Sequence, residues 1–228
     1  MTRRDAIMPV LLLALAAPAA SRAEEYSGGA DANAGIASAT AGSLSISTKT
    51  GALIGVRKIF SGSVSSHDAG HTVTIERYDE LAGGWNAIAH AVAKSNGSFA
   101  ARWKPDARVG QERIRATVDS STATAAAAAP EIAITVFRPG KATWYGPGFY
   151  GNKTACGQKL TKTLQGVAHK TLPCGTPITI LYKGRTVTVP VVDRGPFANG
   201  ANWDITGATA QSLGFATTAR IGTIAATD

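Results

Sequence analysis

Short runs in which apolar and polar residues alternate recur along the first two thirds of the chain. Alternation is strict in Val73–Glu76 and Arg113–Val118, which is typical of β-strands with one buried face. Turn residues separate the runs at the spacing of a two-sheet arrangement. We therefore predict a β-sandwich over residues 43–137. Its expected strands are Ser43–Ser47, Thr72–Tyr78, Trp85–Ala93, Phe99–Trp103, Arg113–Val118 and Ile132–Phe137.

The number and spacing of these runs predict an immunoglobulin-like sandwich, although the paired cysteines of antibody domains are missing. Residues 24–42 are rich in Gly, Ala and Ser without periodicity, which predicts a flexible lead-in. Ala125–Ala129 lies between a Ser/Thr run and Pro130, so a long loop is expected there. Trp85 and Trp103 each sit inside an alternating pattern, and we expect both in the core rather than on a sugar-stacking platform.

A second set of elements follows from residue 138 to the end. Ile178–Tyr182 and Arg185–Val189 are separated only by Lys183-Gly184, which predicts a two-residue β-hairpin of uncertain turn type. Ile205–Gly214 predicts a short helix, capped by Thr206 and ended by its glycine. Ile221–Ala225 predicts a closing strand. Pro190 cannot donate a ladder hydrogen bond, so the chain is expected to leave regular pairing just before Asp193.

Groups able to transfer protons are scarce in this C-terminal part. From Lys141 onward the chain has six Lys and three Arg against Asp193, Asp204 and Asp228, with no Glu and one histidine, His169. Acid–base chemistry must therefore use these two internal aspartates and this histidine, with Tyr145 or Lys170 in support.

Each of these residues also has a purely structural interpretation. Asp193 precedes Arg194-Gly195 and could be a turn carboxylate satisfied by backbone N–H groups. His169 could be a hydrogen-bonded core histidine, and Asp204 could interact with the N-terminus of the predicted helix. His67, His71 and His90 share no spacing typical of metal ligands, so we expect surface or turn roles for them, no metal site and no cofactor.

The N-terminus has the features of a secretory signal peptide over residues 1–23. Arg3 and Arg4 precede an apolar run, Val10–Ala17, and Ser21-Arg22-Ala23 forms a small-x-small cleavage site. The run is too short and too interrupted by proline to span about 30 Å of hydrocarbon. We expect export to the periplasm or the cell wall by a general or twin-arginine route. With no cysteine near the cleavage site, lipid attachment is not predicted.

The full chain carries a formal charge of +8. Removing Arg3, Arg4, Arg22 and Asp5 lowers it to +6, all of it in the C-terminal part. A basic exported protein suits anionic wall polymers, and nucleic acid is not an expected partner. The alternative is that the lysines only maintain solubility.

Cys156 and Cys174 are the two cysteines of the chain. In an oxidising compartment such a pair usually forms a disulfide. The alternative is a nucleophilic thiol beside His169.

Three runs in the C-terminal part occur in a specific order: Trp144-Tyr145-Gly146-Pro147-Gly148, Ala168-His169-Lys170-Thr171-Leu172-Pro173-Cys174-Gly175 and Val192-Asp193-Arg194-Gly195-Pro196-Phe197. Together with Asp204-Ile205-Thr206 they resemble the RlpA-like double-psi β-barrel of the rare-lipoprotein-A family of lytic transglycosylases. The resemblance covers residues 138–228. It implies a six-stranded barrel with a short helix, so that the whole chain is expected to be all-β.

The resemblance further implies cleavage of the β-1,4 bond between N-acetylmuramic acid and N-acetylglucosamine in peptidoglycan glycan strands, with a 1,6-anhydro product. One acid/base suffices for that reaction, and neither a carboxylate nucleophile nor a metal is needed, unlike in hydrolases that use two carboxylates. Asp193 is the expected acid/base, with His169 orienting it and Asp204 as a further catalytic candidate. Expected substrate contacts come from Trp144, Tyr145, Lys170, Arg194 and Phe197.

Two features differ from the family: no glycan-binding repeat follows the barrel, and a sandwich precedes it. A non-catalytic, expansin-like wall-binding or wall-loosening module is therefore the main alternative. A barwin-like secreted defence protein is a third, favoured by the disulfide but not by the His-Lys-Thr-Leu-Pro run. We expect a monomer.

Overall fold

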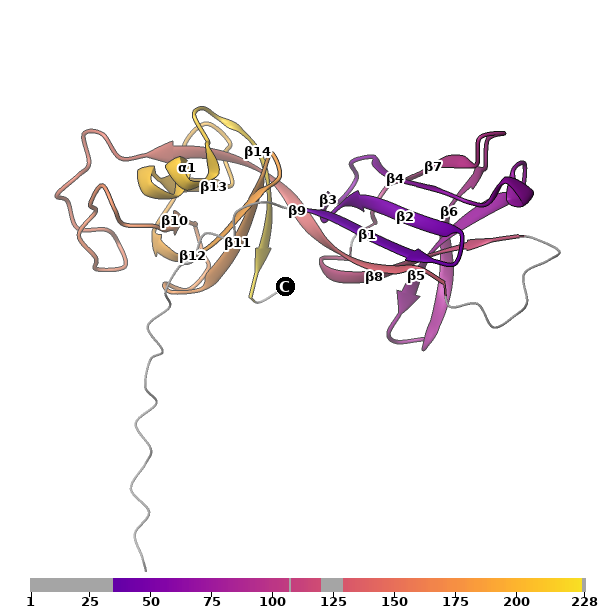
Figure 1. The fold of residues 1–228 in the computed structure, drawn as a ribbon. Coiled ribbons are helices and arrows are strands. Elements are labelled where there is room, and N and C mark those ends of the chain that lie inside the picture. The colour runs from indigo at the N-terminus through magenta and orange to yellow at the C-terminus, as the bar shows by residue number, and fades with distance from the viewer. Residues whose placement is uncertain (1–34, 107, 120–128, 227–228) are drawn as a thin grey trace, which may run out of the picture.

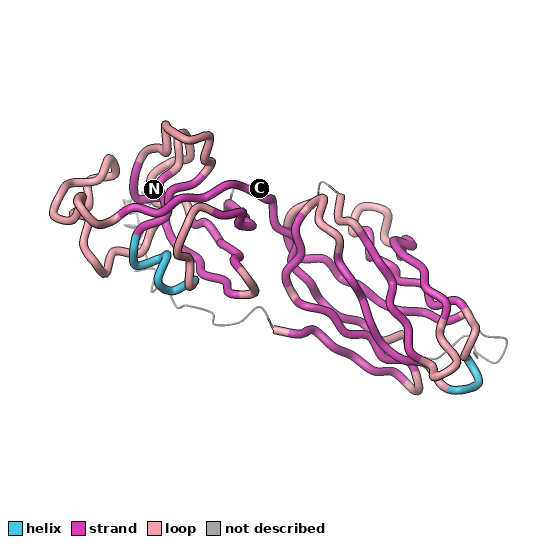
Figure 2. The backbone as a smooth tube through the Cα atoms, turned by 90° about the horizontal axis from the view of Figure 1, so that it is seen from above, coloured by secondary structure: helices cyan, strands magenta, loops and turns pink. Residues whose placement is uncertain are grey.

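The computed structural model describes residues 35–106, 108–119 and 129–226. The predicted signal peptide, most of the predicted lead-in and most of the Ala125–Ala129 loop lie outside these residues. The described residues form two β-rich bodies that lie end to end, as both views show (Figures 1 and 2). In the described ranges no helix combines the length and the apolar character needed to cross a bilayer.

The N-terminal body consists of two sheets that enclose one core. The first sheet has the strand order β1-β2-β4-β7, and the second contains β6-β5-β8-β9, with β3 parallel to β9. Phe60 from the first sheet and Ile75 and Ile134 from the second are at most 1% exposed and belong to one apolar cluster. The strands and the single 3₁₀ turn are β1 (Ile36–Ala41), β2 (Leu44–Lys49), β3 (Gly51–Leu53), β4 (Lys58–Ser63), η1 (Ser66–Asp68), β5 (Thr72–Asp79), β6 (Gly84–Val92), β7 (Ser98–Trp103), β8 (Gly110–Val118) and β9 (Glu131–Tyr145).

All six predicted runs of this body are strands in the structure, within a few residues at their ends except for β9. The immunoglobulin-like connection pattern stays a prediction. The predicted flexible lead-in over residues 24–42 needs a correction, because strand β1 lies inside it. It pairs antiparallel with β2 through a tight turn in which Gly42 has a φ of 58°. Strands β3 and β4 were not predicted, since one is very short and the other contains the buried Lys58.

The two tryptophans of the N-terminal body have different positions. Trp103 is 7% exposed and packs in the core against Phe60, as predicted. The core prediction is wrong for Trp85, which lies outside the cluster. Its ring contacts Tyr78 edge to face, with the guanidinium of Arg115 4.4 Å from its centroid. These cation–π contacts stabilise an aromatic side chain outside the core.

The C-terminal body is a closed barrel of six strands. Its strand order is β13-β10-β12-β11-β14-β9, and β13 pairs with β9 to close the ring. Ile178, Ile180, Ile205 and Ile221 fill its core. The elements that follow β9 are β10 (Val167–Ala168), β11 (Pro177–Tyr182), β12 (Arg185–Asp193), β13 (Trp203–Thr206), α1 (Gly207–Leu213) and β14 (Ala219–Ala225).

The predicted local signals of the barrel are confirmed. Strands β11 and β12 pair antiparallel around Lys183-Gly184, and both turn residues have positive φ, 46° and 82°. This is the type I′ geometry, which matches the twist of a hairpin. Helix α1 begins after Thr206, whose hydroxyl accepts a hydrogen bond from the Thr209 N–H, and ends at Gly214 with a φ of 63°.

The expectation for Pro190 needs a correction. Strand β12 does not end there but continues to Asp193. Pairing with β11 stops at Pro190, and beyond it β12 pairs in parallel with β10. The missing N–H therefore coincides with a change of neighbour and not with the end of the strand.

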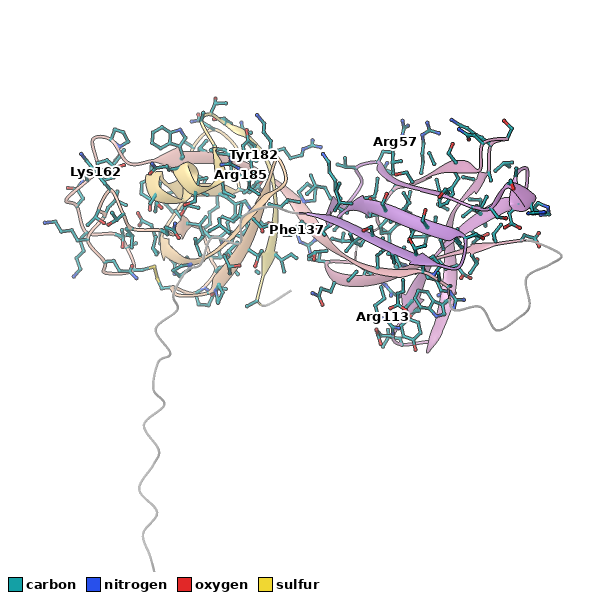
Figure 3. All side chains as sticks on the ribbon, in the orientation of Figure 1. Arg57, Arg113, Phe137, Lys162, Tyr182 and Arg185 are labelled. Carbon is teal, nitrogen blue, oxygen red and sulfur yellow. A yellow bond between two sulfur atoms is a disulfide. The ribbon has the colours of Figure 1, made fainter. Side chains whose placement is uncertain are left out.

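Strand β9 belongs to both bodies. Residues 131–136 pair with β8, and residues 138–142 pair with β14. Phe137 lies at the junction (Figure 3). A side chain at Gly222 of β14 would come within 2.5 Å of Leu53 and 2.7 Å of Phe137, so the two bodies are in close contact.

Candidate functional site

A cavity of about 750 Å³ opens on the barrel, beside the C-terminal end of β9. Residues of β9, β10, β12 and β13 line it, together with the loops that follow β9 and β12. Asp193 and Asp204 are both among its lining residues. The sequence-based expectation that these two carboxylates share one site agrees with this geometry.

Strand register explains how the two aspartates meet. Ala168 of β10 pairs with Asp193 of β12 on one side and with Asp204 of β13 on the other. Asp204 pairs in turn with Thr143 of β9. Paired residues on neighbouring strands lie side by side, and the strands are about 4.8 Å apart. The four residues thus form a row across four strands, and the small Ala168 leaves space between the carboxylates.

Asp193 is fixed by two backbone donors. Its Oδ1 accepts hydrogen bonds of 2.8 Å from the N–H of Ala155 and of 2.8 Å from the N–H of Arg194. Two N–H groups that donate to one carboxylate oxygen fix the orientation of this side chain. Because both bonds use Oδ1, the second oxygen, Oδ2, is available to exchange a proton with a bound molecule.

Asp204 occupies a different electrostatic environment. Burial raises the pKa of its carboxyl, and the negative charge of Asp193 raises it further. A hydrogen bond of 2.8 Å from the Thr143 hydroxyl opposes this shift. The suggested contact with a helix N-terminus is not found, because Asp204 lies in β13 and Thr206 caps α1. The pair therefore combines one carboxyl that retains its proton more readily with one held by backbone donors.

Tyr145, at the end of β9, also lines the cavity. Its hydroxyl is buried and has no hydrogen-bond partner within the described part of the chain. Burial raises its pKa first, and the charge of Asp193 adds to this together with a contact between the hydroxyl and that carboxylate that falls outside hydrogen-bond geometry. A buried hydroxyl without a partner beside two carboxylates is suited to donate a hydrogen bond to a ligand.

His169 does not join the aspartates as expected. It is not among the lining residues of the cavity, although the preceding residue, Ala168, is. Its ring packs 4.4 Å from that of Trp203, and its Nδ1 accepts hydrogen bonds from the N–H groups of Thr171 and Leu172. Successive residues point to opposite faces of a strand, so the side chain after Ala168 leaves the row of carboxylates.

The electrostatics of His169 favour a neutral ring. Burial lowers its pKa, and the charges of Arg194 and Lys170 lower it further. Since Nδ1 accepts, the proton of the neutral ring is on Nε2.

The two cysteines form the predicted disulfide, with their Cα atoms 5.7 Å apart. The bond has a clear link to the site. Cys156 directly follows Ala155, whose N–H binds Asp193, and its own N–H donates to the carbonyl of Val192. The disulfide therefore holds a backbone donor against the carboxylate, and with both sulfurs bonded the alternative of a nucleophilic thiol is wrong.

Aromatic side chains lie around the cavity. Trp144 and Phe197 line it and are 39% and 81% exposed, and Phe149, 54% exposed, lines it as well. Exposed aromatic rings are typical contacts for the apolar faces of sugars. Phe149 was not predicted, because no local pattern distinguishes it from an ordinary loop residue.

Of the two predicted basic substrate contacts, one lies at the cavity and the other does not. Arg194 lines the cavity, and its guanidinium donates to the carbonyl oxygens of His169 and Asp193. Lys170 is exposed and is not among the lining residues. Among the described residues no three His, Cys, Asp or Glu side chains are grouped as metal ligands.

Residues 138–226 match the family described as lytic transglycolase, a double-psi β-barrel family. The C-terminal domain belongs to the RlpA-like double-psi β-barrel family. This result agrees with the closed six-stranded barrel and with the resemblance of its three motifs.

Several curated relatives carry this RlpA-like barrel. The probable endolytic peptidoglycan transglycosylase RlpA of Synechocystis sp. is 43% identical over 77 residues, which cover 33% of this chain and 24% of that protein. The RlpA of Campylobacter jejuni is 45% identical over 76 residues, covering 32% and 28%. That of Neisseria meningitidis is 37% identical over 114 residues, covering 48% of each. The chain thus matches at most about half the length of these relatives.

Proposed function

We propose that the protein is an exported peptidoglycan lytic transglycosylase and that its RlpA-like barrel cleaves the glycan strand in the cavity of Asp193 and Asp204. The observation that carries this proposal is the row of Asp193, Ala168 and Asp204 on three neighbouring strands. The names of the relatives support the reaction class, since each is named as an endolytic peptidoglycan transglycosylase, that of Synechocystis sp. as a probable one.

The reaction needs a proton first on the leaving oxygen and then removed from a hydroxyl. We assign Asp193 as the acid/base, and we assign Asp204 as its partner in holding the proton. Burial raises the pKa of the Asp204 carboxyl, and the charge of Asp193 raises it further, so Asp204 is suited to hold a proton beside Asp193.

In the first step Asp193 donates the proton that it and Asp204 hold to the glycosidic oxygen. The bond from that oxygen to C1 of the muramyl residue breaks at the same time. In the second step the carboxylate accepts the proton of the C6 hydroxyl, whose oxygen bonds to C1 and closes the 1,6-anhydro ring. The proton count is balanced, and neither a cofactor nor a metal takes part.

Other residues bind and orient the strand in this proposal. Tyr145 donates its free hydroxyl to the sugar nearest the aspartates, and Trp144, Phe149 and Phe197 contact sugar faces at the rim. His169 supports the site from behind, through its contact with Trp203 and the backbone hydrogen bond from its N–H to the Asp193 carbonyl. It is a positioning residue and not a proton carrier.

The test is to incubate purified sacculi with the parent protein and with Asp193→Asn, and to analyse the released fragments by mass spectrometry. We expect anhydro ends from the parent, and a rate about 10² to 10⁴ lower for the variant, as for other general acid–base groups. Glu80→Gln is the matched control, because Glu80 is an exposed carboxylate in a turn of the sandwich.

Asp204→Asn tests the shared proton. The rate of the parent should fall as pH rises through the raised pKa of Asp204, and this decline should be absent from the residual activity of the variant. Release by Asp193→Asn at the parental rate would exclude the assignment. Reducing ends would indicate a hydrolase, and binding without new ends would indicate the expansin-like alternative.

A further inference from the structure

The segment between β9 and β10 carries two lysines beside the cavity of the two aspartates. Lys153 lines this cavity, and Lys159 is its partner in an isolated antiparallel bridge. Both residues are exposed. We call them the lysine pair. Like charges on directly paired residues repel, so this arrangement destabilises the segment as long as nothing neutralises it.

The backbone holds the lysine pair in place. The Thr154 N–H donates to the Gln158 carbonyl at 2.7 Å, and the Leu160 N–H donates to the Asn152 carbonyl at 2.8 Å. These hydrogen bonds form a short hairpin, and the disulfide of Cys156 ties the hairpin to the barrel. Both lysines therefore belong to a preformed segment, which reduces the entropy cost of binding.

The lysine pair has no carboxylate partner in the described ranges. Between Glu131 and Asp193 the chain contains no Asp or Glu. All five ion pairs found in the described ranges lie in the sandwich, so neither lysine has a carboxylate oxygen within 4.0 Å. The two charges are therefore open to an anionic ligand.

The same hairpin reaches the proposed acid/base. Ala155, two residues after Lys153, donates its N–H to Asp193 Oδ1 at 2.8 Å. Asp193 and Asp204 both line the cavity, and their negative charge repels an anionic ligand. A cation in the wall of that cavity offsets this repulsion for a ligand whose anionic group lies beside Lys153.

We propose that the lysine pair binds a carboxylate carried by the muramyl residue of the substrate and so distinguishes peptidoglycan strands from uncharged sugar chains. This inference rests on the proposed function, since it assumes that a muramyl residue lies at the aspartates. On a strand without peptides, the lactyl group of each muramyl residue ends in a free carboxylate. On a strand with peptides that carboxyl group is an amide, and the anions are the carboxylates of the peptide. A lysine ammonium suits either source, because it is a compact charge on a flexible stem.

The test compares the binding of three soluble ligands by isothermal titration calorimetry. They are a chitin oligosaccharide, a peptidoglycan glycan fragment of equal length from which an amidase has removed the peptides, and the same fragment with its peptides. The full-length chain in the Asp193→Asn background prevents turnover, and the amide oxygen can still accept from the Ala155 N–H.

We expect Lys153→Gln to weaken binding of the amidase-treated fragment about fivefold, as for the loss of one exposed ion pair. The double variant with Lys159→Gln should weaken it about tenfold or more. Binding of the chitin oligosaccharide, which differs from this fragment by its lack of lactyl carboxylates, should stay unchanged in both.

Two further variants control for the loss of charge as such. Lys162→Gln removes an equal charge from an exposed position of the same loop that is not among the lining residues of the cavity, and it should change no affinity (Figure 3). Lys153→Arg keeps the charge and should keep most of the affinity. Because loss of one like charge relieves repulsion, the thermal unfolding midpoint of Lys153→Gln should be no lower than that of the parent.

The outcomes separate the two sources of the carboxylate. An effect of Lys153→Gln on the amidase-treated fragment alone assigns the lactyl carboxylate as the ligand, and an effect on both fragments includes the carboxylates of the peptide. Equal weakening of all three ligands, no weakening of either glycan fragment, or the same weakening by Lys162→Gln would overturn the proposal. So would a lower unfolding midpoint of Lys153→Gln, which would show a structural role.

Failure of this inference can be told apart from failure of the proposed function. Release of anhydro ends that depends on Asp193, without any effect of Lys153 on binding, would refute only the lysine pair. Binding of glycan fragments that depends on Lys153, without release of anhydro ends by the parent, would refute only the transglycosylase.

Discussion

The sandwich and the barrel use their charged side chains in opposite ways. All five ion pairs found among the described residues join side chains of the sandwich, such as Arg113 with Glu131 and Arg115 with Glu76. In the barrel, Asp193 and Asp204 have backbone or hydroxyl partners, and neither has a cation within 4.0 Å in the described ranges.

This contrast separates structural groups from groups able to bind a ligand. The outer face of the sandwich contains Arg113, labelled in Figure 3. Arg113 and Arg115 lie over the rings of Tyr78 and Trp85, and both guanidinium groups are paired with glutamates. The charged groups of that surface therefore already have partners. The barrel instead places two carboxylates without an ion pair and the Tyr145 hydroxyl in one cavity, which is typical of a site that binds a ligand.

The largest expected effect concerns the disulfide, which links the stability of the barrel to its chemistry. Replacing Cys156 and Cys174 by serine opens a loop with a sequence separation of 18. The free energy of unfolding of the barrel should fall by about 3 kcal/mol. Activity should fall about tenfold or more, because the Ala155 N–H is no longer held against Asp193.

Hydrogen exchange with mass spectrometry can follow the two bodies separately in this variant. The loop of Ala155 should exchange faster, while the sandwich core around Phe60 should keep its protection. Loss of protection in both bodies, or full activity without the disulfide, would contradict the link.

The second prediction concerns the exception in the sandwich, a buried cation without a carboxylate. Lys58 is 7% exposed, and its ammonium donates to the carbonyls of Lys49 and Gly51. Burial, with the charge of Lys49, lowers its pKa from 10.5 to about 8. Between these values the unfolded chain binds more protons than the folded chain, so stability should rise as pH rises.

The rise should reach roughly 3 kcal/mol between pH 8 and 10.5. Urea unfolding at several pH values measures it, with Lys58→Met as the reference that lacks the group. Identical pH dependence in the parent and in Lys58→Met would show that the ammonium is not buried as the structure has it.

The smallest expected effect compares Asp204, which has no ion pair, with Glu131, which is paired with Arg113. Because burial raises the pKa of Asp204, its ionised form destabilises the barrel, and this cost is complete once pH exceeds the raised pKa. Asp204→Asn should therefore raise the thermal unfolding midpoint of the barrel at neutral pH. Glu131→Gln removes an exposed ion pair and should change stability by less than about 1 kcal/mol. A lower midpoint for Asp204→Asn would show that the charge is compensated.

The strands and turns were predictable where apolar and polar residues alternate clearly or where turn residues interrupt them. Alternating runs located six sandwich strands, and Lys183-Gly184 located the barrel hairpin. Strand β1 was not predicted because only the small Ala37 and Ala39 pack on the core, whereas the larger Ile36 is 74% exposed. The prediction for Trp85 was wrong because the alternation of apolar and polar residues in β6 does not show which face of the strand is buried. The arginines that cover the Trp85 ring come from another strand, β8.

The site was predictable in its carboxylates but not in their surroundings. The motifs that resemble RlpA pointed to Asp193 and Asp204, and strand register brings them together. The Ala155 N–H that binds Asp193 is a backbone group, which no side-chain pattern can indicate. His169 was grouped with the aspartates because the motif shows its sequence position and not the direction of its ring.

Strand β9 also imposes a strict parity on the chain. Ile132, Ile134 and Val136 point into the sandwich core, and Ala142, again at an even position, points into the barrel. Insertion of a single residue between Phe137 and Arg138 would either reverse the faces of β9 in one body or turn one body relative to the other. Unlike an ordinary interdomain linker, this boundary tolerates an odd change in length only if a β-bulge absorbs the extra residue.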